Sequence, residues 1–140
     1  MRDPALRLTA ALIALAGAAV AAYLAWAHFA DTPVVCLTGG GCETVQRSEY
    51  ADVAGIPVAL LGLAAYTTVL ALTGWDAPSA RLAAAALALG GLLFSLYLLA
   101  LQLFVIDALC TWCVVNDVLI APALALVTGL RLRNAYVIGT

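Results

Sequence analysis

Four long apolar segments divide the chain, and short polar stretches separate them. An α-helix needs about 20 such residues to cross the hydrocarbon core of a bilayer. These segments lack the alternating pattern of barrel strands, and only helices or closed barrels satisfy their backbone in lipid. The pattern therefore predicts an all-α integral membrane protein, a bundle of four transmembrane helices at about residues 5–29, 56–74, 82–106 and 109–130.

Composition supports lipid as the main solvent of the chain. Of the 140 residues, 66% are hydrophobic and 10% are charged, whereas an ordinary soluble domain is about half apolar and a quarter charged. The net charge of −2 provides no basic surface for nucleic acid. We expect one membrane domain spanning residues 1–140.

The basic residues, all of them arginine, predict how the bundle is oriented. Five of the six would lie on one side of the membrane: Arg2 and Arg7 before the first helix, Arg81 in the turn between the second and third, and Arg131 and Arg133 after the fourth. The loop at residues 30–55 instead contains four acidic residues and one arginine. Both termini are therefore expected to be cytoplasmic, and the loop is expected to face outward.

The first segment could also be read as a secretory signal. Its apolar run is longer than the roughly 7–15 residues of a signal core. Retaining it also keeps the arginines on one side, so we expect a membrane helix.

Four cysteines lie on the predicted outer side. Cys36 and Cys42 flank three glycines in the first loop, and Cys110 and Cys113 form a C-x-x-C motif where the last helix begins. Residues 42–52 are predicted to form a short helix over the bundle. Thiols outside the cytosol tend to be oxidised, so the outer loop is a candidate redox segment.

Three explanations compete for these thiols. Two structural disulfides are possible, since residues i and i+3 of a helix lie within bridging range, but closing so short a loop gains little unfolded-state entropy. A four-cysteine zinc site is the second. The third is redox catalysis, because a helix N-terminus stabilises a thiolate.

The redox interpretation makes structural predictions. Asp107 is the expected N-cap, which would place Cys110 at the third helical position near the aqueous edge. Cys113 would lie one turn deeper, toward lipid. Electrons could then pass from a water-soluble dithiol to a lipid-soluble acceptor, for which a membrane quinone (ubiquinone or menaquinone) is the natural choice. No flavin or nicotinamide motif is visible in the sequence, and under the redox interpretation we expect no metal cofactor.

Several polar residues lie within the apolar segments and are candidates for a quinone site. Asp117, with Asn116, could supply protons or hydrogen bonds to a quinone, or it could be a buried acid paired within the bundle. Gln102 could bind a quinone carbonyl or bridge two helices. Tyr66 could line the pocket or serve only as a helix contact.

The chain resembles the bacterial form of the vitamin K epoxide reductase family over about residues 10–130. The resemblance rests on Cys36-x5-Cys42, Ser48 six residues later, the Gly55-Ile-Pro stretch that leads to Gly62, and Cys110-Thr-Trp-Cys113. It implies a four-helix enzyme of the bacterial inner membrane. It further implies that Cys36 exchanges with a partner protein, Cys42 relays to Cys110, and Cys113 acts at the quinone. Ser48 matches the family's loop-helix serine.

The resemblance also indicates a partner. Some members carry a fused thioredoxin-like domain, but only ten residues follow the last predicted helix. We therefore expect a separate extracytoplasmic thioredoxin-fold (DsbA-like) protein. The implied function is a thiol–quinone oxidoreductase that reoxidises this partner and drives disulfide formation.

Two alternatives stay open. The first is a quinone or quinone-epoxide reductase of the vitamin K cycle type. Vertebrate members have a tyrosine where this chain has Asp117 and an asparagine at about Val58, which weakens that assignment. The second is a non-catalytic membrane scaffold held by structural disulfides.

Overall fold

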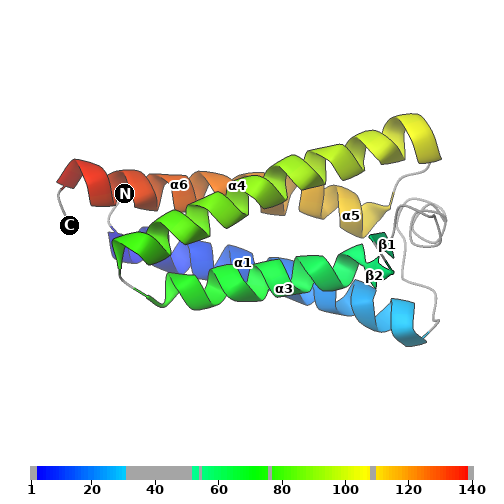
Figure 1. The fold of residues 1–140 in the computed structure, drawn as a ribbon, viewed down its shortest axis with the longest axis horizontal. Coiled ribbons are helices and arrows are strands. Elements are labelled where there is room, and N and C mark those ends of the chain that lie inside the picture. Colours follow the sequence, from blue (N-terminus) through cyan, green and yellow to red (C-terminus); the bar gives the residue numbers. More distant parts are fainter. Residues whose placement is uncertain (1–2, 31–51, 54, 76, 108–109, 139–140) are drawn as a thin grey trace.

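The computed structural model describes residues 3–30, 52–53, 55–75, 77–107 and 110–138. Its elements, in chain order, are α1 (Asp3–Ala30), β1 (Asp52–Val53), β2 (Ile56–Pro57), α3 (Val58–Thr73), α4 (Pro78–Leu101), η2 (Gln102–Ile106), α5 (Thr111–Val115), η3 (Asn116–Ile120) and α6 (Ala121–Ile138). The helices run lengthwise beside one another, with the start of α1 and the end of α6 at one end of the bundle and α5, β1 and β2 at the other (Figure 1). Cys36, Cys42 and Ser48 lie outside the described residues.

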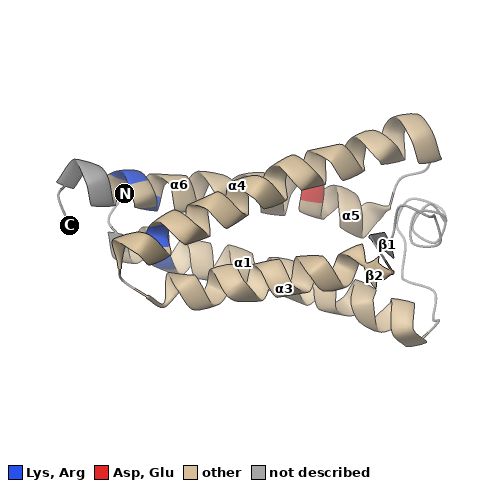
Figure 2. Cartoon of the chain, viewed as in Figure 1, with Lys and Arg blue, Asp and Glu red and all other residues tan. Residues whose placement is uncertain are grey.

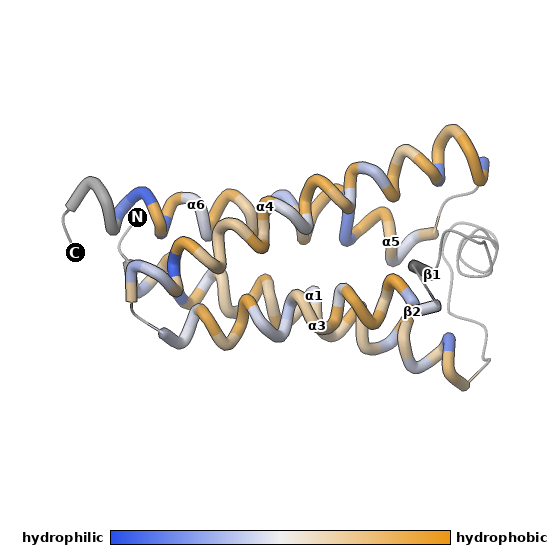
Figure 3. The backbone as a smooth tube through the Cα atoms, viewed as in Figure 1, coloured by the Kyte–Doolittle hydropathy of each residue, from blue (hydrophilic) through white to orange (hydrophobic). Residues whose placement is uncertain are grey.

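Three of the described helices have the length and composition of membrane spans. Pro4–Ala30, Pro78–Ile106 and Thr111–Asn134 are long and apolar enough to cross a bilayer. The fourth, α3, has 16 residues, about 24 Å of helix against a hydrocarbon core of about 30 Å. Figure 3 shows hydrophobic residues along all of these helices. The all-helical membrane architecture is thus confirmed in outline, and the count of four spans stays a prediction.

A two-residue hairpin precedes α3, where a helix beginning at residue 56 was expected. Val53 pairs with Ile56 and Asp52 with Pro57 in an antiparallel ribbon. Gly55 has a φ of 84°, a left-handed conformation that glycine adopts without steric cost. The chain therefore reverses at Gly55, and Asp52 belongs to a strand rather than to the predicted loop helix.

The helices at the arginine-rich end are longer than their apolar runs. Pro78 begins α4, because proline is preorganised for the first turn of a helix. Arg81 therefore lies in the first turn of α4 rather than in the loop before it. Arg131 and Arg133 lie within α6 rather than after it, since arginine is a good helix former.

Asp107 ends a helical segment instead of beginning one, so the predicted N-cap is wrong. Its φ of 58° is left-handed, and its backbone N–H donates to the carbonyl of Gln102. Aspartate tolerates this conformation better than most residues. Cys110 is itself the N-cap of α5, with extended φ and ψ of −97° and 119°. The cysteine therefore precedes the first helical turn instead of occupying its third position.

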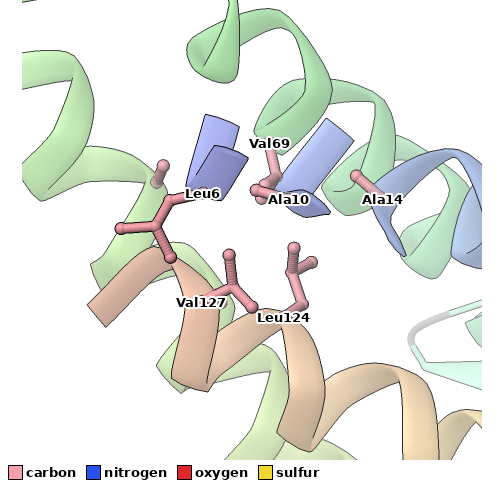
Figure 4. Packing of buried hydrophobic residues seen from close by; sticks show 8 residues of the cluster. Leu6, Ala10, Ala14, Val69, Leu124 and Val127 are labelled. Atoms are coloured by element: carbon pink, nitrogen blue, oxygen red, sulfur yellow. The ribbon is translucent and has the colours of Figure 1, made fainter. Parts of the chain in front are cut away.

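Small side chains let the helices pack closely near the arginine-rich end. The buried cluster comprises Leu6, Ala10, Ala14, Val69, Ala84, Ala88, Leu124 and Val127, which converge from α1, α3, α4 and α6 (Figure 4). Lipid is as apolar as these side chains, so close van der Waals contact is what favours their association. The cluster closes one end of the bundle.

Basic residues gather at that same end (Figure 2). The Arg7 guanidinium donates from Nε to the Thr73 carbonyl at 2.9 Å and from Nη2 to the Gly74 carbonyl at 2.6 Å. Arg81 donates from Nη1 to the Arg131 carbonyl at 3.2 Å. Arg7 thereby binds carbonyls at the end of α3 that the helix leaves unsatisfied. Arg81 joins α4 to α6.

Candidate functional site

The C-x-x-C motif lies at the beginning of α5, and its two thiols have different surroundings. The backbone N–H of Cys113 donates to the Cys110 sulfur at 3.4 Å, the contact that an N-cap side chain makes. Cys110 has no exposed surface, so its thiol is covered by protein, and its expected position near the aqueous edge of the membrane stays a prediction. Cys113 is partly buried. A sulfur that accepts a backbone N–H at a helix start is favoured as the thiolate.

Gln102 connects this motif to a buried carboxylate. Its side-chain oxygen accepts the backbone N–H of Cys110 at 3.0 Å, and its Nε2 donates to Asp117 Oδ2 at 3.2 Å. Gln102 and Asp117 are both only 2% exposed. Gln102 therefore bridges η2 to η3, which was one of its two predicted roles, and it also satisfies the start of α5.

Asn116 forms a second branch of the same network. Its Nδ2 donates to Asp117 Oδ1 at 3.1 Å and to Ser95 Oγ at 3.4 Å, and its Oδ1 accepts the hydroxyl of Tyr66. Tyr66 comes from α3 and Ser95 from α4. Side chains from α3, α4, η2 and η3 thus meet in one polar cluster.

Ser95 is a member of this cluster that the sequence analysis missed. It lies seven residues before Gln102 and therefore on the same face of the helix. A serine and a glutamine at that spacing in an otherwise apolar segment are a signal that could have identified it. Buried polar groups in lipid need partners, and here Ser95 accepts from Asn116 while Gln102 donates to Asp117.

A cavity of about 400 Å³ lies beside the polar cluster. Val20 and Leu24 of α1, Leu87 and Phe94 of α4, and Leu124 of α6 contribute to its apolar wall. Its polar lining residues are Tyr66, Ser95, Gln102, Asn116 and Asp117, and Cys113 also lines it. Figure 2 shows an acidic residue within the bundle between α5 and α6. Organic ligand sites have this size and this mixture of apolar walls and few polar groups.

The structure brings together four of the polar residues predicted for a quinone site, namely Gln102, Tyr66, Asn116 and Asp117. Cys113 lies on the same cavity, and Cys110 is joined to it through Gln102. Among the residues that the structure describes, no three His, Cys, Asp or Glu side chains are placed to hold a metal ion. The zinc alternative involves Cys36 and Cys42, so it is not tested.

The family comparison agrees with this arrangement. A model of the Vitamin K epoxide reductase family matches residues 8–128, from the first helix to within α6. Members of that family are oxidoreductases with quinones as electron partners. The match includes both cysteine pairs and every residue of the cavity. The chain belongs to the vitamin K epoxide reductase family.

Proposed function

We propose that the chain is a thiol–quinone oxidoreductase that reoxidises a separate extracytoplasmic thioredoxin-fold protein and thereby drives disulfide formation. The observation that carries this proposal is the position of Cys113. Its side chain lines a largely apolar cavity whose polar residues are hydrogen-bonded to one another and, through Gln102, to Cys110.

The proposed reaction begins with the partner's dithiol. A partner thiolate attacks the Cys36–Cys42 disulfide, and the partner leaves with its own disulfide, so the loop pair is reduced. The Cys42 thiolate then attacks the Cys110–Cys113 disulfide and forms a bond to Cys110, which releases Cys113 as a thiolate. Cys36 attacks Cys42 and restores the loop disulfide, which releases Cys110 as a thiolate, and the two protons given up by Cys36 and Cys42 pass to Cys110 and Cys113.

The last step restores the Cys110–Cys113 disulfide. The two thiols lose two electrons and two protons, and a quinone, the lipid-soluble acceptor, takes up both to become a quinol. The chain's own contribution is to hold Cys110 and Cys113 one helical turn apart, with Cys113 on the cavity wall. Water is kept away because most of the wall is apolar.

The cavity wall fits a quinone head group. A flat ring requires apolar surfaces on its faces, and its two oxygens require hydrogen-bonding groups at the edge. Phe94 and Leu24 are suitable for the faces. The Asp117 carboxylate can accept a hydroxyl of the quinol product, and Tyr66 or Asn116 can donate to a quinone oxygen in exchange for a hydrogen bond within the cluster. Ser48 of the loop is assigned to the same site through the family resemblance.

The proposed topology has four spans in a bacterial inner membrane, with both termini cytoplasmic. Basic residues gather at the end where α1 begins and α6 ends, and α5 lies at the opposite end (Figures 1 and 2). Arginine-rich ends face the cytoplasm, so this distribution favours a cysteine motif on the outer side.

The test is quinone reduction by the purified protein in liposomes, with a reduced DsbA-like protein as electron donor and either ubiquinone or menaquinone analogues. We expect quinone absorbance and partner thiols to fall together. Cys113→Ala should abolish quinone reduction, while Val114→Ala on the same helix should retain it. A Cys113→Ala variant that still passes electrons to quinone would overturn the proposal.

Two alternatives predict different outcomes. A vitamin K-type reductase would reduce a quinone epoxide, yet Val58 and Asp117 line the cavity where the resemblance places the asparagine and tyrosine of vertebrate members. A non-catalytic scaffold would lose stability when all four cysteines become serine, while exported proteins would stay normally oxidised. Assays of epoxide reduction and of exported disulfides distinguish both from the proposed function.

A further inference from the structure

Gly17 of α1 and the ring of Tyr66 of α3 occupy the same small space. A Cβ placed on Gly17 would lie 2.5 Å from Tyr66 Cε1 and 2.6 Å from both Cδ1 and Cζ. Real Cβ atoms do not come so close to another atom, so any larger residue at position 17 must displace the ring. Gly17 is itself buried.

The position of this ring matters to the site because Tyr66 lines the cavity and its hydroxyl donates to Asn116 Oδ1. That bond determines which end of the Asn116 amide faces which neighbour. With Oδ1 turned to Tyr66, Nδ2 is left to donate to Asp117 and Ser95. A displaced ring would therefore remove a hydrogen bond and reorient the polar group next to it.

The direction of the displacement follows from the packing. Tyr66 is bounded by α1 on one side and by the cavity on another. Atoms of a well-packed interior leave little room elsewhere, so a methyl group at position 17 would push the ring into the cavity. The space available to a ligand would then decrease.

We propose that Gly17 is a positioning residue that sets the width of the cavity, and with it the size of the quinone ring system that this chain accepts. The missing side chain lets the Tyr66 ring lie against α1, so that the ring takes up less of the cavity and a larger quinone can enter. This inference rests on the proposed function, since it concerns the quinone of that same site.

The experiment compares Gly17→Ala with Gly90→Ala in the full-length protein in liposomes. Gly90 lies in α4, and a Cβ there would meet no atom within 4 Å, so it controls for replacing a helical glycine by alanine. The measured quantities are the KM for a one-ring benzoquinone, the KM for a two-ring naphthoquinone and the KM for the reduced partner.

We expect Gly17→Ala to raise the naphthoquinone KM about 10-fold, as loss of one buried hydrogen bond and of ring clearance would do. The benzoquinone KM should rise less, and the partner KM should match that of Gly90→Ala. Equal changes for both quinones, or none, would overturn the proposal. Tyr66→Phe should raise the KM for both quinones alike, because it removes the hydroxyl and keeps the ring.

A double variant tests whether Gly17→Ala changes the quinone KM through the Tyr66 ring. In a Tyr66→Leu background no ring remains to be displaced, so adding Gly17→Ala should change the KM for neither quinone. If Gly17→Ala alone fails to fold, folding of the Gly17→Ala/Tyr66→Leu protein supports the proposal, and its failure overturns it.

Direct binding separates this inference from the proposed function. Quinones quench tryptophan fluorescence, so binding of the naphthoquinone can be titrated without turnover. If the wild-type protein binds neither quinone, the proposed function itself is contradicted. If the wild-type protein and Gly17→Ala bind naphthoquinone equally tightly, only the proposed role of Gly17 is contradicted.

Discussion

Gln102 and Asp117 lie fifteen residues apart on separate helical segments, and the Gln102 side-chain nitrogen donates to Asp117 Oδ2 at 3.2 Å. The oxygen of the same amide accepts the Cys110 backbone N–H at 3.0 Å. One buried glutamine thus joins the cysteine motif to the carboxylate of the cavity wall. Replacing Gln102 by an apolar residue would remove the acceptor of the Cys110 backbone N–H and a donor to the Asp117 carboxylate.

Gln102→Leu should therefore destabilise the fold. An unsatisfied buried polar group costs about 1–3 kcal/mol, so we expect the free energy of unfolding to fall by about 2 kcal/mol or more. Thermal loss of the helical circular dichroism signal in detergent measures this. The control is Leu103→Met, because Leu103 is the next residue in η2 and is 47% exposed. Equal melting temperatures for the two variants would contradict the assigned bridge.

The hydrogen bond between Tyr66 and Asn116 predicts energetic coupling. Tyr66→Phe and Asn116→Ala should together cost less than the sum of the single effects, by about 1 kcal/mol. The cycle is measured on quinone affinity. The control cycle replaces Tyr66→Phe by Tyr97→Phe, because Tyr97 of α4 is 54% exposed. The effects of Tyr97→Phe and Asn116→Ala should be additive. Additivity in the Tyr66 cycle would show that the bond contributes nothing.

Asp117→Asn should weaken quinone binding without affecting the exchange with the partner. The substitution keeps the shape of the side chain but replaces one acceptor oxygen by a donor, which then faces Gln102 Nε2 or Asn116 Nδ2. We expect the quinone KM to rise about 10-fold and the partner KM to stay at the wild-type value. Steady-state kinetics with each substrate varied in turn measures both. A rise in the partner KM alone would place Asp117 elsewhere in the reaction.

Arg7 should contribute to stability through the two carbonyls that it binds. Arg7→Gln removes the donors to Thr73 and Gly74 and should lower the free energy of unfolding by about 1–3 kcal/mol. Arg133→Gln is the matched control, because it removes the same charge from an exposed side chain near the same end. Both variants should oxidise the partner at wild-type rates when folded. Equal stability of the two would mean that only the charge of Arg7 matters.

The apolar pattern was enough to predict the helices, because a chain this hydrophobic has few structures open to it in lipid. The polar candidates were found for the same reason, since a glutamine, asparagine or aspartate within such a segment must have a partner. The pattern could not reveal which partner each has. Tyr66 and Asn116 meet across 50 residues, and that contact depends on how α3 packs against η3.

Local geometry was predicted less well. Asp107 is a good N-cap residue by type, but it is equally suited to a left-handed helix end, and only tertiary packing decides between the two. The hairpin at Gly55 depends on a strand partner that precedes it. The close approach of Gly17 to Tyr66 is also invisible in the sequence, because glycine in a membrane helix is common and signals nothing by itself.

The wide turn of η3 has a consequence for the length of the chain. Successive residues of an α-helix point about 100° apart, and a π-helical turn contains more residues than an α-helical one. Deleting one residue between Asn116 and Ile120 would therefore let the turn close into an α-helix and leave α6 almost in register with α5. Deleting one residue of α1 between Leu6 and Ala14, where the helix has no wide turn, would instead rotate Leu6 by about 100° relative to Ala14 and out of the buried cluster. Single-residue deletions in the turn of η3 should therefore be less harmful than single-residue deletions in α1.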